Sequence, residues 1–532
     1  MAGIGEPLRR ALVLIGFMGA GKTTLARELA RELDVAALDS DELLEQRLGH
    51  SPAREFELRG EAAFRAAEEA LVCELLDSAA PGAVIALGGG SILSERVRTA
   101  LEPHVVVLLD IDAERAWERV GAPEAAGGPL GRPLARDREA FIALHGERRE
   151  LYERHAHAYL PSLRLGGATR VLGALRALAA AAPGTRLVWA QSASGDYPVL
   201  LGRGLLRASG APDGAELWPL DRSRSRAFCV TDESVAALYG DQLAGLLGQV
   251  AIGAGERHKT LASAESVWDA LIDAGVDRGD HLVALGGGVV GDLAGFCAAT
   301  YQRGVPIVQI PTTLVAQVDS AYGGKTGVDL PQAKNYIGAY HQPAGVLVDP
   351  DTLESLPAAE LSAGWVEVLK TALIAGGELW RRVSAGAELD DWTILACART
   401  KLSVVAEDER DGGRRQVLNL GHTIGHAIET ATGYRRYRHG EAVGLGLLAA
   451  LRLSGAAQLR EQVRELLLAR ELPVRLDGAS VEDVVAATAR DKKRVGKTLP
   501  FVLLSEPGEP LTGCAVEPEE LQAAVAELLE RG

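Results

Sequence analysis

The chain has 532 residues, which at roughly 150 residues per domain predicts three or four compact units and excludes a single small binding module. Its 47% hydrophobic and 24% charged residues are ordinary for folded proteins, so wholesale disorder is excluded as well. The 72 acidic residues outnumber the 56 basic ones, for a net charge of -16 that repels nucleic acid and acidic lipid. We therefore expect small-molecule substrates and no nucleic-acid or membrane partner, with local basic clusters for any anionic substrate.

The first predicted unit is a parallel α/β sheet. Short apolar runs alternate with helical patterns, as expected for strands buried on both faces. These runs are residues 11–15, 35–38, 83–87 and 105–109. An Ala-rich segment then leads into Pro183-Gly184, which is typical of a linker. We expect a first domain over residues 1–178 and a linker over 179–190.

A second α/β series follows the predicted linker. Its expected strands are residues 197–201, 227–231, 249–252, 281–285, 307–310 and 345–348. From about Pro357 onward, Ala, Leu, Glu and Arg recur at helical spacing. We therefore expect an α/β domain over residues 191–356 and a mostly helical domain over 357–532.

The cysteines and the apolar runs indicate the cell compartment. The five cysteines are odd in number and form no C-x-x-C pair, so a disulfide framework is not expected. Residues 9–20 imitate the basic and apolar regions of a signal peptide, but the apolar run continues into Gly21-Lys22-Thr23, which belongs to the motif described next. No run in the sequence reaches the roughly 18 apolar residues that a membrane span needs. The prediction is a cytoplasmic protein.

Residues 16–23 fit the phosphate-loop pattern G-x-x-x-x-G-K-T between an expected strand and an expected helix. Backbone N–H groups of such a loop surround phosphate oxygens at a helix N-terminus. Lys22 would reach the outer phosphates, and the Thr23 hydroxyl would coordinate Mg²⁺. In Asp39-Ser40-Asp41, one carboxylate would orient Mg²⁺ through water, for which we choose Asp39, and the other would accept a substrate hydroxyl. A helix N-cap at Ser40 or Asp41 is the alternative role of this segment. The predicted ATP-binding residues are Gly16, Gly19, Ala20, Gly21, Lys22, Thr23 and Thr24.

Residues 8–178 resemble shikimate kinase in six ordered motifs. Besides the phosphate loop, these are Leu38-Asp39-Ser40-Asp41, Phe64-Arg65, Leu87-Gly88-Gly89-Gly90, Gly131-Arg132-Pro133-Leu134, and Arg148 with Leu151-Tyr152. The resemblance implies that Asp41 binds the shikimate hydroxyls, that Arg65 and Arg148 hold its carboxylate, and that the backbone of Gly88, Gly89 and Gly90 approaches its ring. Arg132 would be the lid arginine, which contacts ATP and stabilises the transferring phosphoryl group. ATP with Mg²⁺ is the expected cofactor.

A second glycine loop, residues 286–292, satisfies G-x-G-x-x-G after a strand, but the acidic residue expected about 20 positions later is missing. We therefore do not expect an ordinary Rossmann fingerprint. Residues 317–327 and Lys334-Asn335 concentrate polar, basic and glycine residues. This composition indicates an anion-binding loop.

Histidines in the helical domain indicate a metal site. His422 and His426 are four residues apart and share one helix face, which is how zinc enzymes often present ligands. Spacing alone favours these two together, with Glu429 or His439 completing the set. A pair of core or surface histidines without a metal is equally compatible with this spacing.

The segment from about Tyr197 to Leu504 resembles 3-dehydroquinate synthase. Its matching runs include Gly255-Glu256 with Lys259-Thr260, residues 285–296, Thr300-Tyr301, Arg303-Gly304, Pro311-Thr312-Thr313, residues 318–328, Lys334-Asn335, Glu367-Val368 with Lys370, Leu418-Asn419, residues 421–426, residues 439–443 and Asp491-Lys492-Lys493. The resemblance implies a Rossmann-like NAD domain and a helical metal domain. It assigns a catalytic Zn²⁺, or Co²⁺, to Glu367, His422 and His439 and leaves His426 in the substrate pocket.

The resemblance also implies the remaining site residues. NAD⁺ would be bound by Asp232, Glu256, Lys259, Gly286, Gly287, Gly288, Gly291, Asp292, Thr312, Thr313, Lys325 and Lys334. Catalysis would use Arg303, Asp319, Lys325, Lys370, Lys401, Arg415, Asn419 and His426. Substrate contacts would come from Lys334, Asn335, Lys492 and Lys493.

The implied reaction converts 3-deoxy-D-arabino-heptulosonate 7-phosphate into 3-dehydroquinate and phosphate, and the NAD⁺ is regenerated. With the kinase this predicts a bifunctional enzyme of chorismate and aromatic amino acid biosynthesis, and a homodimer formed through the synthase half. Ala321-Tyr322 replaces two smaller residues of many family members. The alternatives for the second half are a related sugar-phosphate cyclase and a metal- and NAD-dependent alcohol dehydrogenase. The alternative for the first half is a non-catalytic phosphate-loop regulator.

Overall fold

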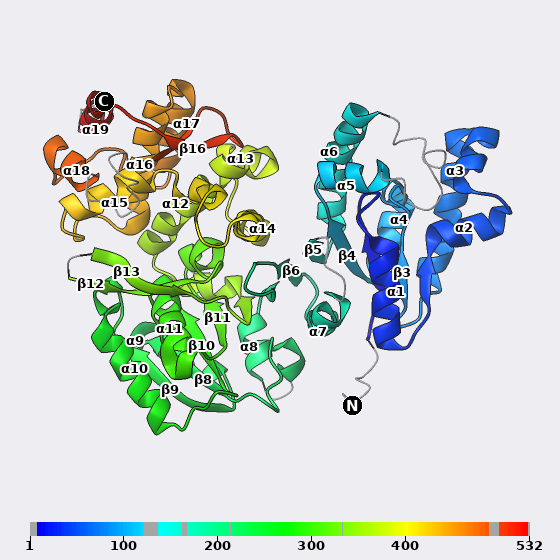
Figure 1. The fold of residues 1–532 in the computed structure, drawn as a ribbon, viewed down its shortest axis with the longest axis horizontal. Coiled ribbons are helices and arrows are strands. Elements are labelled where there is room, and N and C mark those ends of the chain that lie inside the picture. The colour runs from blue at the N-terminus through cyan, green and yellow to red at the C-terminus, as the bar shows by residue number, and fades with distance from the viewer. Residues whose placement is uncertain are drawn as a thin grey trace. The chain divides into compact units, whose positions relative to one another are not determined.

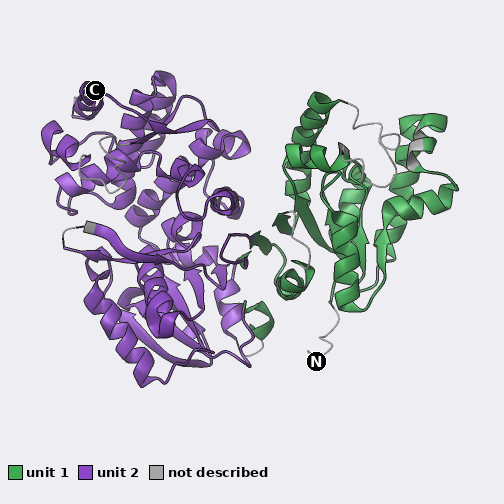
Figure 2. Cartoon of the chain, in the orientation of Figure 1, with its two compact units in different colours: residues 1–189, 198–200, 213–219 green, residues 190–197, 201–212, 220–532 purple. Residues whose placement is uncertain are grey.

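The computed structural model describes residues 8–121, 137–161, 167–211, 214–331, 333–488 and 500–529. The chain divides into two compact units, which Figure 2 shows in different colours. Unit 1 comprises residues 1–189, 198–200 and 213–219, and unit 2 comprises the rest. The predicted site residues Arg132, Lys492 and Lys493 lie outside the described residues.

Unit 1 contains a parallel sheet with the strand order β2-β3-β1-β4-β5-β6. Figure 1 labels its strands β3, β4, β5 and β6. The strands are β1 (Leu12–Ile15), β2 (Ala37–Asp39), β3 (Val84–Ala86), β4 (Val105–Asp110), β5 (Ala158–Pro161) and β6 (Arg186–Ala190). The first four overlap the predicted apolar runs. β1, β3 and most of β4 are buried as predicted, whereas β2 is only partly buried. The last two were not predicted, and β6 lies within the segment expected to be a linker.

Helices connect these strands. They are α1 (Lys22–Leu33), α2 (Ser40–Leu48), α3 (Pro52–Asp77), α4 (Glu95–Ala100), α5 (Ala113–Gly121), α6 (Arg138–His155) and α7 (Gly167–Ala180). The loops after β1, β2 and β3 all leave the carboxyl edge of the parallel sheet. Ligands of open α/β sheets bind at this edge.

Unit 2 begins with an α/β part whose parallel strands follow the order β14-β11-β10-β8-β9. These are β8 (Ala227–Asp232), β9 (Leu246–Ile252), β10 (His281–Gly286), β11 (Ile307–Pro311) and β14 (Gly345–Val348), all close to predicted runs. A buried apolar cluster joins this sheet to α10 (Leu261–Asp273) and α11 (Gly288–Thr300). Strand β7 (Tyr197–Leu201), also predicted, is divided between the two units.

An antiparallel hairpin of β12 (Lys325–Leu330) and β13 (Ala333–Tyr340) follows a short π-helical turn, η6 (Ala316–Ser320). The hairpin occupies part of the polar segment in which an anion-binding loop was expected. Ser320 closes the π-helical turn. π-Helical turns are frequent at functional sites.

The remainder of unit 2 is mostly helical, which confirms that prediction. Its helices include α12 (Ala358–Ala375), α13 (Gly377–Ser384), α14 (Asp391–Glu407), α15 (His422–Ala431), α16 (His439–Leu453), α17 (Ala457–Leu468), α18 (Val481–Thr488) and α19 (Pro518–Glu527). A small hairpin of β15 (Phe501–Leu504) and β16 (Pro510–Cys514) accompanies them. In the residues that the structure covers, no helix is long and apolar enough to cross a membrane. All five cysteines are free thiols, as expected.

Candidate functional sites

The phosphate loop of unit 1 lies between β1 and α1. Gly16, Gly19 and Gly21 adopt positive φ angles of 141°, 82° and 96°, which glycine tolerates and other residues resist. The Lys22 ammonium donates hydrogen bonds to the carbonyls of Gly16 (2.9 Å) and Phe17 (3.2 Å). The lysine therefore lies over the loop in which phosphate is expected.

The two predicted Mg²⁺ ligands lie side by side. The Thr23 hydroxyl donates to Asp39 Oδ2 at 2.7 Å, and a hydroxyl beside a carboxylate is an oxygen pair of the kind that Mg²⁺ prefers. Asp39 Oδ1 also caps α2 by accepting from the N–H of Asp41 (3.0 Å). The cap holds Asp41 at the same sheet edge.

The predicted shikimate residues gather around the loop after β3. The hydroxyl of Tyr152 and Nη1 of Arg148 (3.4 Å) both donate to the carbonyl of Gly89. A Cβ on Gly88 would lie 2.5 Å from Asp41 Oδ1, so this position must remain glycine for Asp41 to stay where it is. Arg148 is buried, and its Nε has no hydrogen-bond partner among the described residues.

Arg65 is held by a carboxylate that sequence reasoning missed. Glu68 is buried, its Oε2 lies 2.6 Å from Arg65 Nη1, and its Oε1 accepts from the Ser91 hydroxyl at 3.0 Å. The i, i+3 spacing of Arg65 and Glu68 on one helix was the available signal. Glu68 thus fixes the direction of the guanidinium.

In unit 2, the second glycine loop closes tightly between β10 and α11. A Cβ on Gly286 would lie 2.6 Å from Val290 Cγ2, and one on Gly287 would lie 2.8 Å from Thr313 Cγ2. Thr312 donates its N–H to the Gly286 carbonyl at 3.0 Å, whereas its buried Oγ1 has no partner in the described part of the chain. A glycine cradle with an unpaired hydroxyl beside it fits a dinucleotide.

Further predicted NAD residues surround Lys259, which is buried. Its ammonium donates to Asp292 Oδ2 and to Asn335 Oδ1, both at 2.6 Å. Burial opposes protonation of Lys259, but the charges of Asp292 and Glu256 outweigh it and raise the pKa of the lysine. Asp232 caps α9 (Glu233–Tyr239) at the end of β8, by accepting from the N–H of Ser234 at 2.9 Å.

Asp319 joins three elements of unit 2. Its Oδ2 lies 2.8 Å from the Lys370 ammonium on α12, and its backbone carbonyl accepts from Lys401 on α14 at 2.7 Å. Lys401 also contacts Asp319 Oδ1. Burial lowers the pKa of Lys401 to about 8, even though Asp319 acts in the opposite direction. Lys401 can therefore exchange a proton near neutral pH.

Two more residues predicted to be catalytic contact the segment before α15 or belong to it. Lys325 lies 2.5 Å from Asp411 Oδ2. Arg415 is buried, and its Nη2 donates to the Gly323 carbonyl at 3.0 Å. Its Nε has no partner among the described residues, so it retains a donor for an anion.

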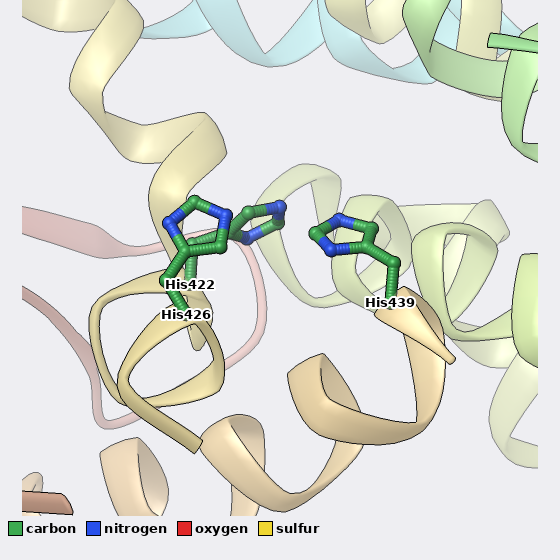
Figure 3. Close-up of side chains that lie close together, drawn as sticks. All are labelled: His422, His426 and His439. Atoms are coloured by element: carbon green, nitrogen blue, oxygen red, sulfur yellow. The ribbon is translucent and has the colours of Figure 1, made fainter. Parts of the chain in front are cut away.

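Three histidines meet in the helical part. His422 and His426 on α15 face His439 at the start of α16 (Figure 3), and one nitrogen from each lies within 4.8 Å of the others. Glu367 on α12 contributes to the same place, because its Oε1 lies 3.6 Å from His422 Nε2 and 3.5 Å from His439 Nε2. The structure thus gathers both the set favoured by spacing and the set implied by the resemblance.

Glu367 supplies a test of whether a cation fits. Its side chain is 1% exposed, and the Lys370 ammonium, 2.5 Å from Oε2, balances its charge in the described structure. Oε1, the oxygen beside the two histidine rings, accepts no hydrogen bond among the described residues, and a buried oxygen without a partner is costly. The neighbouring histidine nitrogens and this carboxylate are suitable ligands for Zn²⁺. The residues present therefore fit the metal.

Two more predicted catalytic residues lie at the ends of helices. Arg303 belongs to the turn after the C-terminus of α11. Asn419 ends the short helix η8 (Arg414–Asn419), shortly before α15.

The geometry describes an enzyme with a phosphate loop in one unit and a nucleotide cradle beside a histidine cluster in the other. Comparisons with known proteins agree. A model of the shikimate kinase family matches residues 18–164. Models of the 3-dehydroquinate synthase N-terminal and C-terminal domains match residues 249–363 and 364–494.

Individual relatives cover the synthase part. The 3-dehydroquinate synthase of Symbiobacterium thermophilum is 44% identical over 349 residues, 61% of this chain and 96% of that protein. That of Halorhodospira halophila is 43% identical over 358 residues, 64% of this chain and 99% of that protein. The chain therefore belongs to the 3-dehydroquinate synthase family, and it also carries a shikimate kinase domain.

A solved structure agrees in fold. The 2-epi-5-epi-valiolone synthase from Streptomyces hygroscopicus, solved with NAD⁺ and Zn²⁺ bound, has a TM-score of 0.56 and 28% identity, over 62% of this chain and 96% of that one. The higher identity to the dehydroquinate synthases favours the predicted activity over that of a related sugar-phosphate cyclase.

Proposed function

We propose that the chain catalyses two reactions of chorismate biosynthesis: ATP-dependent phosphorylation of shikimate, and cyclisation of 3-deoxy-D-arabino-heptulosonate 7-phosphate to 3-dehydroquinate with release of phosphate. The observation that carries the synthase assignment is the buried Glu367 carboxylate between His422 and His439, in a chain 44% identical to a named dehydroquinate synthase.

In the kinase unit, the phosphate loop and Lys22 hold the phosphates of ATP, and Thr23 and Asp39 hold its Mg²⁺. Asp41 positions the shikimate hydroxyl that is phosphorylated, while Arg65 and Arg148 bind the shikimate carboxylate as paired guanidinium groups. The proximity of Asp39 and Asp41 at the start of α2 supports this division of roles. Arg132 is proposed as the lid arginine from the resemblance.

In the synthase unit, Glu367, His422 and His439 would hold Zn²⁺, and the Gly286–Gly291 segment with Thr312 would hold NAD⁺. When bound, these groups supply Lewis acidity and a reversible hydride acceptor. Lys370 and Lys401 contact Asp319, and Arg415 contacts the carbonyl of Gly323 four residues later. These three cations support binding of an anionic substrate in a chain of net charge -16. Lys401, whose pKa is about 8, can give or take a proton there.

We further propose a cytoplasmic homodimer formed through the synthase half, with domain limits at residues 178, 190 and 356. The family resemblance supports the dimer and the domain limits, and the cysteine usage supports the compartment. Sedimentation of the full chain tests the oligomer, because a monomer at micromolar concentration would contradict it.

The experiment for the proposed function measures both reactions on the purified full chain. Phosphate should be released from the heptulosonate phosphate without net formation of NADH, and ATP should be consumed only when shikimate is present. Net NADH formation would instead indicate an alcohol dehydrogenase. If the rate of ATP consumption did not depend on shikimate, the first unit would be a phosphate-loop domain with another function.

A further inference from the structure

Glu429 lies behind the histidine cluster rather than within it. It is the eighth residue of α15, and its side chain is 5% exposed. Its Oε2 lies 3.5 Å from Nδ1 of His439. The other ring nitrogen, Nε2, lies 3.5 Å from Glu367 Oε1, on the side of the proposed metal. The His439 ring is therefore held between two carboxylates, one at each nitrogen.

The spacing of His422 and His426 predicts Glu429 or His439 as a further metal ligand. Glu429 instead contacts Nδ1 of His439, whereas Glu367 contacts Nε2, the other nitrogen of the same ring. The two ring nitrogens point in different directions, so a carboxylate at Nδ1 is placed to act on the ligand and not on a metal at Nε2.

The position of the Glu429 carboxylate is itself determined. Its Oε1 accepts a hydrogen bond from the Lys334 ammonium at 3.4 Å, and that ammonium lies 4.5 Å from the centre of the Tyr434 ring. Lys334 belongs to β13, so the contact ties the β12–β13 hairpin to α15. Burial leaves the carboxylate little freedom to rotate away from His439.

We propose that Glu429 is a positioning residue for the metal: it accepts the Nδ1 proton of His439, fixes this tautomer and ring orientation, and leaves the Nε2 lone pair available to Zn²⁺. The inference rests on the proposed metal site. Carboxylates behind ligating histidines raise the basicity of the ligand, and their loss typically weakens metal binding about 10- to 100-fold. Neutral His439 without this partner would populate both tautomers, one of which blocks Nε2 with a proton.

The test measures Zn²⁺ affinity on the full chain by competition with a chromophoric chelator. Glu429→Gln keeps the size of the side chain and removes its charge, so we expect Zn²⁺ to bind about 10- to 100-fold more weakly. The matched control is Glu461→Gln, which removes the same charge on α17, where Glu461 contacts Arg464. This control should bind Zn²⁺ as the unaltered chain does.

A double-mutant cycle separates a direct effect from a distorted fold. In a His439→Asn background, Glu429→Gln should change Zn²⁺ affinity by no more than about twofold, because its target is absent. A loss as large as in the unaltered chain would overturn the proposal, because Glu429 would then act elsewhere.

The single variants distinguish two failures. If the unaltered chain binds Zn²⁺ tightly and Glu429→Gln binds it equally well, the role of Glu429 is wrong and the metal site stands. If the unaltered chain itself binds no Zn²⁺, the proposed metal site is wrong and the inference falls with it.

Discussion

Glu367 and Lys370, three residues apart on α12, place a carboxylate and an ammonium 2.5 Å from each other, and their side chains are only 1% and 2% exposed. The same ammonium lies 2.8 Å from Asp319, whose side chain is 19% exposed. Lys370 therefore compensates two carboxylates, and the fully buried one belongs to the proposed metal site.

The first prediction follows from this pair. Lys370→Met leaves Glu367 without a cation in the metal-free protein, and removal of one partner of a buried pair costs about 3–5 kcal/mol. Bound Zn²⁺ would restore a positive charge beside Glu367, so the loss should be smaller in the loaded protein. Thermal unfolding of the full chain with EDTA and with Zn²⁺ measures both values. Equal losses in the two conditions would contradict the assignment of Glu367 to the metal.

The second prediction concerns the shikimate carboxylate. Glu68→Gln removes the charged partner that holds Arg65 at 2.6 Å, so the guanidinium loses its fixed direction. We expect the KM for shikimate to rise about tenfold, as for the loss of one charge-assisted hydrogen bond. The KM for ATP serves as the internal control, because Glu68 contacts the shikimate side. If the KM for ATP rose as much as the KM for shikimate, the substitution would have disturbed the fold of the whole unit.

The third prediction concerns pH. Burial lowers the pKa of His281 to about 4, below its ordinary value of 6.5, and the nearby charge of Arg222 acts in the same direction. Unfolding restores proton binding, so the stability that neutral His281 contributes is present above pH 6.5 and is lost as the pH falls toward 4. His281→Gln should therefore flatten the pH dependence of unfolding between pH 6.5 and 4. An unchanged slope would show that other groups control acid unfolding.

The fourth prediction concerns the backbone of Gly323, which contacts Tyr197 and Arg415. The buried hydroxyl of Tyr197 accepts the N–H of Gly323 at 3.2 Å, and the Gly323 carbonyl accepts from Arg415. Tyr197→Phe leaves that N–H unsatisfied, at a cost of about 1–3 kcal/mol, and should raise the KM for the heptulosonate phosphate. Tyr239→Phe, which removes a more exposed hydrogen bond to Ser355, should leave this KM unchanged. Equal effects of the two variants would exclude a specific role for Tyr197.

Much of the fold could be predicted because buried parallel strands appear as short apolar runs. The β12–β13 hairpin was missed because it carries Lys, Asn and Gly, and exposes Tyr336 and Ile337. Strand β6 was missed because Pro183-Gly184 before it indicated a linker.

The site residues also differ in how far they could be predicted from the sequence. The phosphate loop could be predicted because all its parts are consecutive. Lys370 and Lys401 contact Asp319 across 51 and 82 residues of sequence, and spacing could not group them. Only the family resemblance placed them together. Neither spacing nor resemblance indicated that Glu429 lies behind His439, because that depends on where α16 packs against α15.

The central claim is that one chain holds two independent active sites, and a paired assay of Lys22→Ala and Glu367→Ala tests it most directly. Lys22→Ala should lower ATP-dependent phosphorylation of shikimate by at least about a hundredfold and leave phosphate release from the heptulosonate phosphate intact. Glu367→Ala should do the reverse. If either substitution abolished both activities while the protein remained folded, the two-site account would be contradicted.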